Sequence, residues 1–267
     1  MPPTPRARAR LLARSGRAQP GLFAPLVLAQ AAEIEALPLD AFLTDPTKLA
    51  KGLTALHQAL GTDAITVFGG DWSGDTVKAA VEATGRLATT SAGEPVLVAV
   101  LTGPARMAEQ AEAGSLADEV AAAVLEDVGA RLLGVLKRFL EAGVNLVVVV
   151  EEALPPPAVL DAWRSVVTPL VNVTRFHQAA PVMIVRHATA DALSGVPPSI
   201  GLCGPEGTTI AGPANRLRGV TLAAEPKEWA APPPGTPLTL TAGVVPGSCR
   251  FAEVLEACRR VTDGLVP

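Results

Sequence analysis

Titratable side chains stand just after several short apolar runs of this sequence. Glu151 and Glu152 follow the fourth run, His187 follows the fifth, and Asp71 lies shortly beyond the second. Carboxylates and imidazoles are the usual general acids and bases of enzymes, so these four residues are the predicted catalytic residues. Because adjacent residues of a strand point to opposite faces, only one of the two glutamates can face a shared site.

Two arginines in similar positions could hold an anion. Arg106 comes shortly after the third run and Arg250 after the eighth, and a guanidinium binds a carboxylate or phosphate through paired hydrogen bonds. They are the predicted substrate-binding residues. The candidates also have structural explanations, since an aspartate such as Asp71 can cap a helix and Arg106 can pair with Glu109 or Glu112 on its own helix.

The cysteines offer a second chemistry. Zinc binds thiolates and imidazoles, and a catalytic zinc keeps one position open. His187, Cys203 and Cys249 all follow apolar runs and form the candidate metal site. The alternative for each thiol is a small buried side chain, which is our interpretation of Cys258 in the last helix. We therefore predict no cofactor, with zinc as the alternative.

Composition and motifs exclude several classes of function. The sequence contains no Gly-x-Ser-x-Gly elbow, Walker loop or Cys-x-x-Cys pair, which argues against the corresponding hydrolases, nucleotide-binding proteins and redox proteins. A pI near 5.5 argues against a nucleic-acid-binding surface, and the apolar runs are far short of the ~20 residues of a membrane span. Three cysteines in 267 residues favour a reducing cytosol. The expected partner is a small-molecule substrate, and the protein is expected to be cytoplasmic.

The N-terminal segment 1–20 is basic. Its five arginines precede the first acidic residue, Glu33. An Arg-rich start without acids can be an organelle transit peptide. We favour a solvated helix or frayed tail in front of a domain that spans 21–267.

Eight apolar runs of strand length set the predicted architecture. Each run is continuous, which is the pattern of a strand buried on both faces. The first run lacks the glycine-rich turn that usually follows it in a doubly wound sheet. Eight buried strands that alternate with helices over about 250 residues predict an α/β fold, a single-domain (β/α)8 TIM barrel with its site at the carboxyl ends of the strands. The predicted strands are 23–29, 64–68, 95–101, 144–150, 181–186, 199–203, 219–223 and 237–241.

Helices are predicted between these runs from their caps and apolar faces. Thr44-Asp45-Pro46 begins one helix, whose leucines recur every three or four residues on one face. A second, long helix is expected to end at Gly143, and a third buries Trp163 after three consecutive prolines.

Four short segments carry a family resemblance. They are Phe42-Leu43-Thr44-Asp45-Pro46, Gly61-Thr62-Asp63-Ala64-Ile65-Thr66-Val67-Phe68, Leu101-Thr102-Gly103-Pro104 and Ala142-Gly143-Val144-Asn145. With the strand order, they resemble the uroporphyrinogen decarboxylase superfamily of TIM barrels. That superfamily includes porphyrin-pathway decarboxylases, zinc-dependent corrinoid methyltransferases and cobalamin-independent methionine synthase. The resemblance implies a decarboxylase-like lyase or a methyltransferase, and a homodimer.

The catalytic signatures of that superfamily are altered here. The segment 28–33, which matches the Arg-bearing loop of the decarboxylases, has no arginine, and Gly70 occupies the position of their catalytic aspartate. No tyrosine is present to match their active-site tyrosine. The His-x-Cys zinc pair of the methyltransferases corresponds to His187-Ala188-Thr189, which keeps only the histidine. These departures argue against authentic uroporphyrinogen decarboxylation.

We therefore expect a divergent enzyme that acts on a small anionic metabolite by acid–base chemistry at the mouth of the barrel. One alternative is a zinc-dependent thiol or corrinoid methyltransferase. Another is a barrel without activity that serves as a binding or partner subunit. The fold by itself does not decide among them, because TIM barrels host many chemistries.

Overall fold

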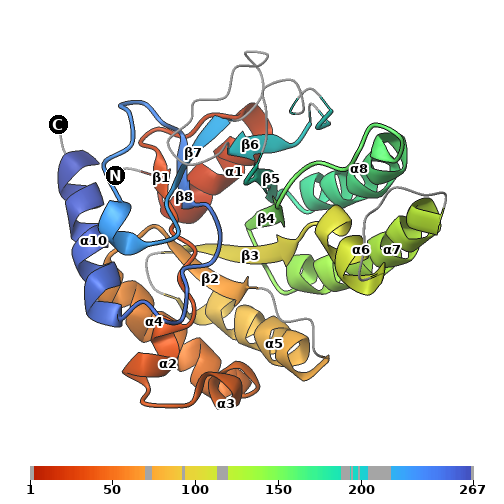
Figure 1. Cartoon of the computed structure of the whole chain (residues 1–267). Helices are drawn as coiled ribbons and strands as arrows, with labels where there is room; N and C mark the ends of the chain where they lie inside the picture. Colours follow the sequence, from red (N-terminus) through yellow and green to blue (C-terminus); the bar gives the residue numbers. More distant parts are fainter. Residues whose placement is uncertain are drawn as a thin grey trace.

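A computed structural model describes residues 3–69, 74–91, 94–112, 120–187, 193, 195–197, 199–203 and 218–265. Eight parallel strands alternate with helices in a nearly closed barrel, so the predicted single-domain (β/α)8 fold is confirmed (Figure 1). Ladders join the strands in the order β1-β8-β7-β6-β5-β4-β3-β2. The strands are β1 (Leu22–Phe23), β2 (Ala64–Gly69), β3 (Val96–Thr102), β4 (Leu146–Glu151), β5 (Ala180–Val185), β6 (Gly201–Cys203), β7 (Arg218–Leu222) and β8 (Leu238–Thr241).

Each predicted run overlaps one of these strands, and the first is the least accurate. β1 is only two residues long, and of these only Phe23 falls within the predicted 23–29. Beyond it the backbone stays buried but leaves the regular ladder, because the N–H of Leu26 donates to the Thr241 hydroxyl at 3.1 Å instead of to a backbone carbonyl.

The strands separate two apolar layers. Alternate residues such as Val148 and Ile184 fill the barrel interior, and their neighbours such as Val149 and Met183 pack against the surrounding helices. Both faces of every central strand are therefore buried, which explains why the sequence shows continuous apolar runs.

The helices cover the outside of the strands (Figure 1). Those between β1 and β4 are α2 (Gln30–Ile34), α3 (Leu39–Leu43), α4 (Pro46–Leu60), α5 (Gly74–Thr90), α6 (Pro104–Glu112) and α7 (Val120–Glu141). Later in the chain come α8 (Leu160–Phe176), the short 3-10 helix η1 (Pro226–Glu228) and α10 (Phe251–Leu265). No helix in these ranges is both long and apolar enough to cross a membrane.

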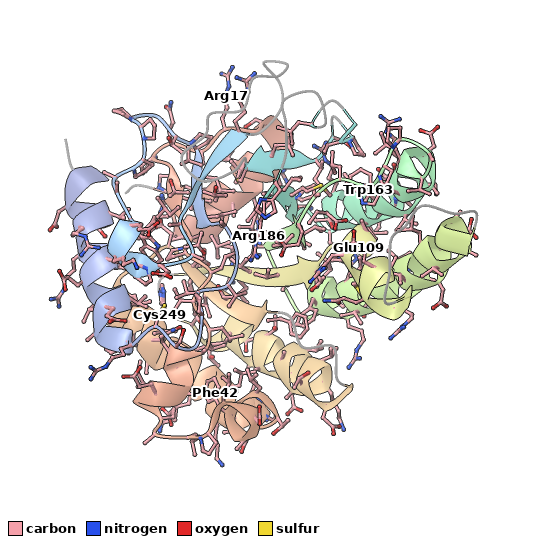
Figure 2. All side chains as sticks on the ribbon, in the orientation of Figure 1. Arg17, Phe42, Glu109, Trp163, Arg186 and Cys249 are labelled. Atoms are coloured by element: carbon pink, nitrogen blue, oxygen red, sulfur yellow. The ribbon has the colours of Figure 1, made fainter. Side chains whose placement is uncertain are left out.

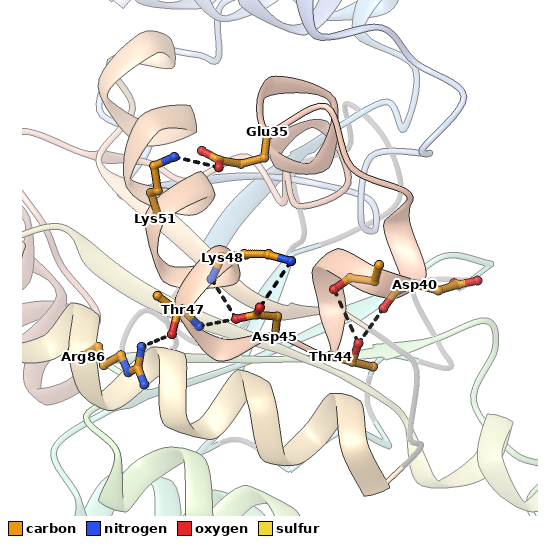
Figure 3. A network of polar contacts seen from close by, with 9 residues as sticks. Glu35, Asp40, Thr44, Asp45, Thr47, Lys48, Lys51 and Arg86 are labelled. Carbon is orange, nitrogen blue, oxygen red and sulfur yellow. Dashed lines mark hydrogen bonds and ion pairs between the residues drawn. The ribbon is translucent and has the colours of Figure 1, made fainter.

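The start of α4 follows the sequence prediction. Asp45 is the N-cap, and its Oδ1 accepts hydrogen bonds from the N–H groups of Thr47 at 2.9 Å and Lys48 at 3.1 Å (Figure 3). Pro46 occupies the first turn, where its missing N–H costs nothing. The arginine side chain of Arg86 on α5 donates to the hydroxyl of Thr47, which joins the two helices at this end.

Helix α1 (Pro5–Ser15) packs on the N-terminal end of the barrel. Its Ala9 and Leu12 are buried with the interior layer. The guanidinium of Arg8 pairs with Asp63 and donates to the carbonyl of Gly21 at 2.8 Å. The predicted basic segment thus contains a helix, but the helix is packed against the barrel and not free in solvent.

The same Asp63 joins the two ends of the strand order. Its Oδ2 accepts from the N–H of Phe23 at 2.9 Å, and its own N–H donates to the Phe23 carbonyl at 3.0 Å. Arg8, Asp63 and Phe23 therefore tie α1, β2 and β1 together.

Candidate active site

A hollow of about 280 Å³ lies at the C-terminal mouth of the barrel, where TIM-barrel enzymes carry their active sites. It is formed by the ends of β2, β3, β4 and β5, the start of α6 and the loop after β8. Its lining residues are Gly69, Val100, Leu101, Thr102, Arg106, Gln110, Val150, Glu152, Arg186, Gly243 and Val244.

The alternation of the strands decides which side chains enter this hollow. On β4 the interior residues are Val148 and Val150, so Glu152 continues the inward series. On β5 the interior residue Ile184 is followed, two positions later, by Arg186. Glu152 is thus the one of the two adjacent glutamates that lines the hollow.

Glu152 and Arg186 form the polar centre of the mouth. Nη1 of Arg186 donates to Oε1 of Glu152 at 2.9 Å, and its Nε donates to the carbonyl of Ala242 at 3.1 Å. The side chains are 36% and 37% exposed, so a ligand in the hollow can reach both. Figure 2 shows Arg186 near the middle of the barrel view.

A glycine makes room for this arginine. A Cβ atom at Gly243 would lie 2.1 Å from Nη2 of Arg186. Our sequence prediction did not include Arg186. Arg186 lies two residues beyond Ile184, so the alternation of a strand places both side chains on the same face. The sequence could not show that this face points inward, because the run is apolar on both faces.

Arg106 lies across the hollow, on the first turn of α6. It lines the mouth together with Gln110. Its guanidinium also pairs with Glu109 at 3.4 Å, and the two side chains are 44% and 42% exposed. The intrahelical pair foreseen for Arg106 is therefore present, and it leaves the side chain accessible at the mouth.

Glu151 lies on the opposite face of β4 and is completely buried. Its Oε1 accepts hydrogen bonds from the indole N–H of Trp163 at 2.8 Å and the N–H of Ala105 at 3.0 Å. Its Oε2 accepts from the N–H of Arg106 at 3.1 Å. Burial raises the pKa of Glu151 to about 7, although the three donors oppose this shift. Of the two predicted catalytic glutamates, this one is placed outside the mouth hollow.

His187 stands at the rim of the mouth. Its side chain is 80% exposed, and its Nε2 lies 3.9 Å from Oε2 of Glu152. The N–H of His187 donates to the Glu152 carbonyl at 2.7 Å, which continues the ladder between β4 and β5. Asp71, the remaining predicted acid, lies outside the described residues.

The predicted zinc ligands do not come together. Cys203 is buried in the barrel interior, where desolvation raises its pKa to about 12. Cys249 lines a different hollow, whereas His187 is at the exposed rim. Among the described residues, no group of three or more His, Cys, Asp or Glu side chains could hold a metal ion. The donor set of this part of the chain therefore does not fit a catalytic zinc.

The second hollow, of about 500 Å³, lies between η1 and α10. Its two cationic side chains are already paired, with Lys227 2.5 Å from Glu225 and Arg260 3.2 Å from Glu256. Burial raises the pKa of the Cys249 thiol, and nearby glutamates add to that shift. Both cations of this hollow are therefore paired within it, and its thiol is not ionised.

Arg250, the other predicted substrate-binding residue, precedes α10. It is exposed, and its N–H donates to Oε2 of Glu253 at 2.9 Å. That bond caps the helix start, and the side chain is not among those that line the mouth.

Comparison with known proteins relates this geometry to solved structures. No family model matches the sequence, and no curated protein matches it. A methyltransferase from Methanosarcina mazei is similar in structure, with a TM-score of 0.63 and 13% identity over 97% of this chain and 98% of that one. The apo homocysteine methyltransferase from Escherichia coli gives a TM-score of 0.49 and 13% identity over 90% of this chain and 95% of that one. At these identities the likeness to the first structure establishes the shared fold.

Proposed function

We propose that this barrel is an enzyme that binds a small anionic metabolite at its C-terminal mouth and uses Glu152 to move a proton there. The observation that carries the proposal is the Glu152–Arg186 ion pair, 2.9 Å long, on the inward face of the mouth. A carboxylate next to a guanidinium provides a proton carrier and an anion site side by side.

The size and charge of the mouth support a small anion. Among the residues that the structure describes, Arg106 and Arg186 are the two cations that line it, and Gln110 and Thr102 add neutral hydrogen-bonding groups. A volume of about 280 Å³ suits a metabolite of modest size. A substrate that bears many carboxylates would need more cations than these two, in keeping with the sequence departures from true uroporphyrinogen decarboxylases.

The chemistry that fits is proton transfer at a carbon next to a carboxylate. In a decarboxylation, the bond to the departing CO2 breaks and its electron pair stays on the substrate carbon. Protonated Glu152 then delivers a proton to that carbon. His187 lies 3.9 Å from Glu152 and is exposed to water, so it can return a proton to the glutamate. Arg106 or Arg186 holds the remaining anionic group.

Calorimetric titration with inorganic sulfate tests the anion site. Sulfate keeps its charge across the neutral pH range and fits the hollow. Arg186→Met and Arg106→Met should each weaken binding by about tenfold, the loss typical of one charge-assisted contact. Arg86→Met is the matched control, because Arg86 on α5 has a similarly exposed intrahelical ion pair away from the mouth. Absence of sulfate binding by the wild type, or equal binding by all variants, refutes the proposal and favours a barrel without activity.

Methyl transfer is the second candidate function. It is favoured by the solved methyltransferase that shares the fold over nearly the whole of both chains. The described donor set does not fit zinc, so no metal-dependent step is assigned. Elemental analysis of the purified protein separates the two candidates. One zinc per chain that is lost in His187→Ala supports methyl transfer, whereas a metal-free protein that binds sulfate supports the acid–base enzyme.

A further inference from the structure

We infer that Glu151 is a positioning residue for the mouth, and that its ionised carboxylate fixes the turn that presents Arg106 to an anionic ligand. This inference rests on the proposed function, because it concerns how the same site is assembled. It assigns to Glu151 a role that does not require the residue to touch the substrate.

The turn between β3 and α6 is hydrogen-bonded to β4 through both the backbone and a side chain of β4. The N–H of Gly103 donates to the carbonyl of Val150 at 2.8 Å. Two and three residues after Gly103, the N–H groups of Ala105 and Arg106 donate to the two oxygens of the Glu151 carboxylate at 3.0 and 3.1 Å. The backbone of Arg106 is therefore tethered directly to Glu151.

The fit around the carboxylate is tight. A Cβ atom at Gly103 would lie 2.1 Å from the carboxyl carbon of Glu151, so only glycine allows this approach. On the far side, Trp163 of α8 donates its indole N–H to Oε1 at 2.8 Å. Three elements, β4, α6 and α8, thus converge on one buried carboxylate.

The charge of Glu151 matters for this tether. An ionised carboxylate accepts from both backbone N–H groups, and the positive end of the α6 dipole favours the negative charge. A protonated carboxyl group carries a hydrogen on one oxygen and loses acceptor capacity there. The hold on either Ala105 or Arg106 then weakens, and the start of α6 becomes free to move away from the mouth.

Several charged groups surround this pair of elements. Glu109 on α6 is the neighbouring carboxylate whose charge opposes ionisation of Glu151. Glu152 and His187 lie at the mouth, where Glu152 pairs with Arg186 and lies 3.9 Å from His187. On α8, Asp161 and Arg164 pair with one another. Because these groups also titrate or bear charge, the test compares two proteins that share all of them.

The test is the ratio of sulfate dissociation constants for Glu151→Gln and the wild type, measured by calorimetry at pH 8.5 and pH 5.5. Glutamine keeps the shape but turns an N–H group toward one of the backbone donors, so it imitates the protonated acid. We expect about tenfold weaker binding by the variant at pH 8.5 and a ratio near one at pH 5.5. The effects of Glu152 and His187 cancel in this ratio.

Glu33→Gln is the matched control. Glu33 also accepts a backbone N–H at a helix start, from Phe251 of α10 at 2.8 Å, but it does not line the mouth. Its ratio should stay near one at both pH values. If Arg106→Met loses sulfate while Glu151→Gln binds as the wild type does at pH 8.5, the positioning role is wrong and the proposed function stands. If the wild type binds no sulfate, the proposed function itself is wrong, and the positioning role that rests on it is wrong as well.

A second measurement follows Glu151 in the wild type and does not use the glutamine variant, so it applies even if that variant does not fold. Fluorescence of Trp163, isolated by subtracting the spectrum of Trp163→Phe, should follow the protonation of its partner Glu151. By linkage, a ligand that prefers the ionised form tenfold lowers the midpoint of this titration by about one pH unit. An unchanged midpoint in saturating sulfate, or one that rises, overturns the inference.

Discussion

Replacing Glu151 by glutamine should change the way in which the stability of the barrel depends on pH. The carboxyl group is completely buried, and burial raises its pKa from 4.5 to about 7. In the unfolded chain the same group is exposed to water and has its ordinary pKa. The folded protein therefore retains a proton on Glu151 over a range of pH in which the unfolded chain has lost it.

The sign and size of the effect follow from this difference. Below pH 4.5 both states are protonated, and the stabilising contribution of the proton is fully present. As the pH rises toward 7, the unfolded state binds fewer protons than the folded state, so the free energy of unfolding falls by about 1.4 kcal/mol for each pH unit. Over the range given by the two pKa values of Glu151 the loss amounts to roughly 3 kcal/mol.

Urea unfolding of both proteins at several pH values between 4.5 and 8 gives the necessary data. The difference in free energy of unfolding, wild type minus Glu151→Gln, should fall by roughly 3 kcal/mol across this range and level off above pH 7. Other titrating groups affect both proteins alike. A constant difference would mean that the folded pKa is ordinary. A difference that grows with pH would mean that the three hydrogen bonds and the helix dipole outweigh desolvation, which refutes the reasoning.

Two further predictions concern the opposite ends of the barrel. Arg8→Met should lower the free energy of unfolding by about 3 kcal/mol in urea titrations, because it leaves the buried side of Asp63 unpaired. Arg10→Met on the exposed face of the same helix is the control, and a loss below about 1 kcal/mol for Arg8→Met would contradict the assignment. Gly243→Ala should displace the flexible end of Arg186 and weaken sulfate binding about tenfold with little change in Tm. Gly85→Ala, where a Cβ meets open space, should leave binding unchanged, and equal binding by both variants would contradict the placement of Arg186.

The elements of this fold could be predicted because their signals are local. A strand buried on both faces must be apolar throughout. The start of a helix such as α4 is indicated by its N-cap residue Asp45 and by Pro46 in the first turn. The long helix predicted to end at Gly143 is described as α7 from Val120 to Glu141. Trp163 is buried as predicted. These features depend on neighbours in the sequence and need no knowledge of the rest of the chain.

The site was harder to predict because its signals are not local. The sequence predicted Glu151 and Glu152 equally as catalytic residues, because both follow the same strand. Only the orientation of β4 in the barrel shows which of the two side chains faces the mouth. Among the described residues, the predicted zinc ligands do not come together for a related reason. His187, Cys203 and Cys249 all follow strands, but one lies at the rim, one in the interior and one beside α10. A residue's position after a strand predicts at which end of the barrel it lies. It does not predict how far its side chain is from the others at that end.

The two adjacent glutamates show how one strand end can serve both assembly and chemistry. Glu152 faces the hollow and pairs with Arg186, while Glu151 faces the helices and holds the start of α6. A peptide bond joins them, so a movement of the β4 end alters both arginines of the mouth together. The firm closure by Arg8 and Asp63 lies at the N-terminal end, remote from these charges. The charged mouth and the Arg8–Asp63 pair thus occupy opposite ends of the barrel, so a substitution at one end leaves the charges at the other in place.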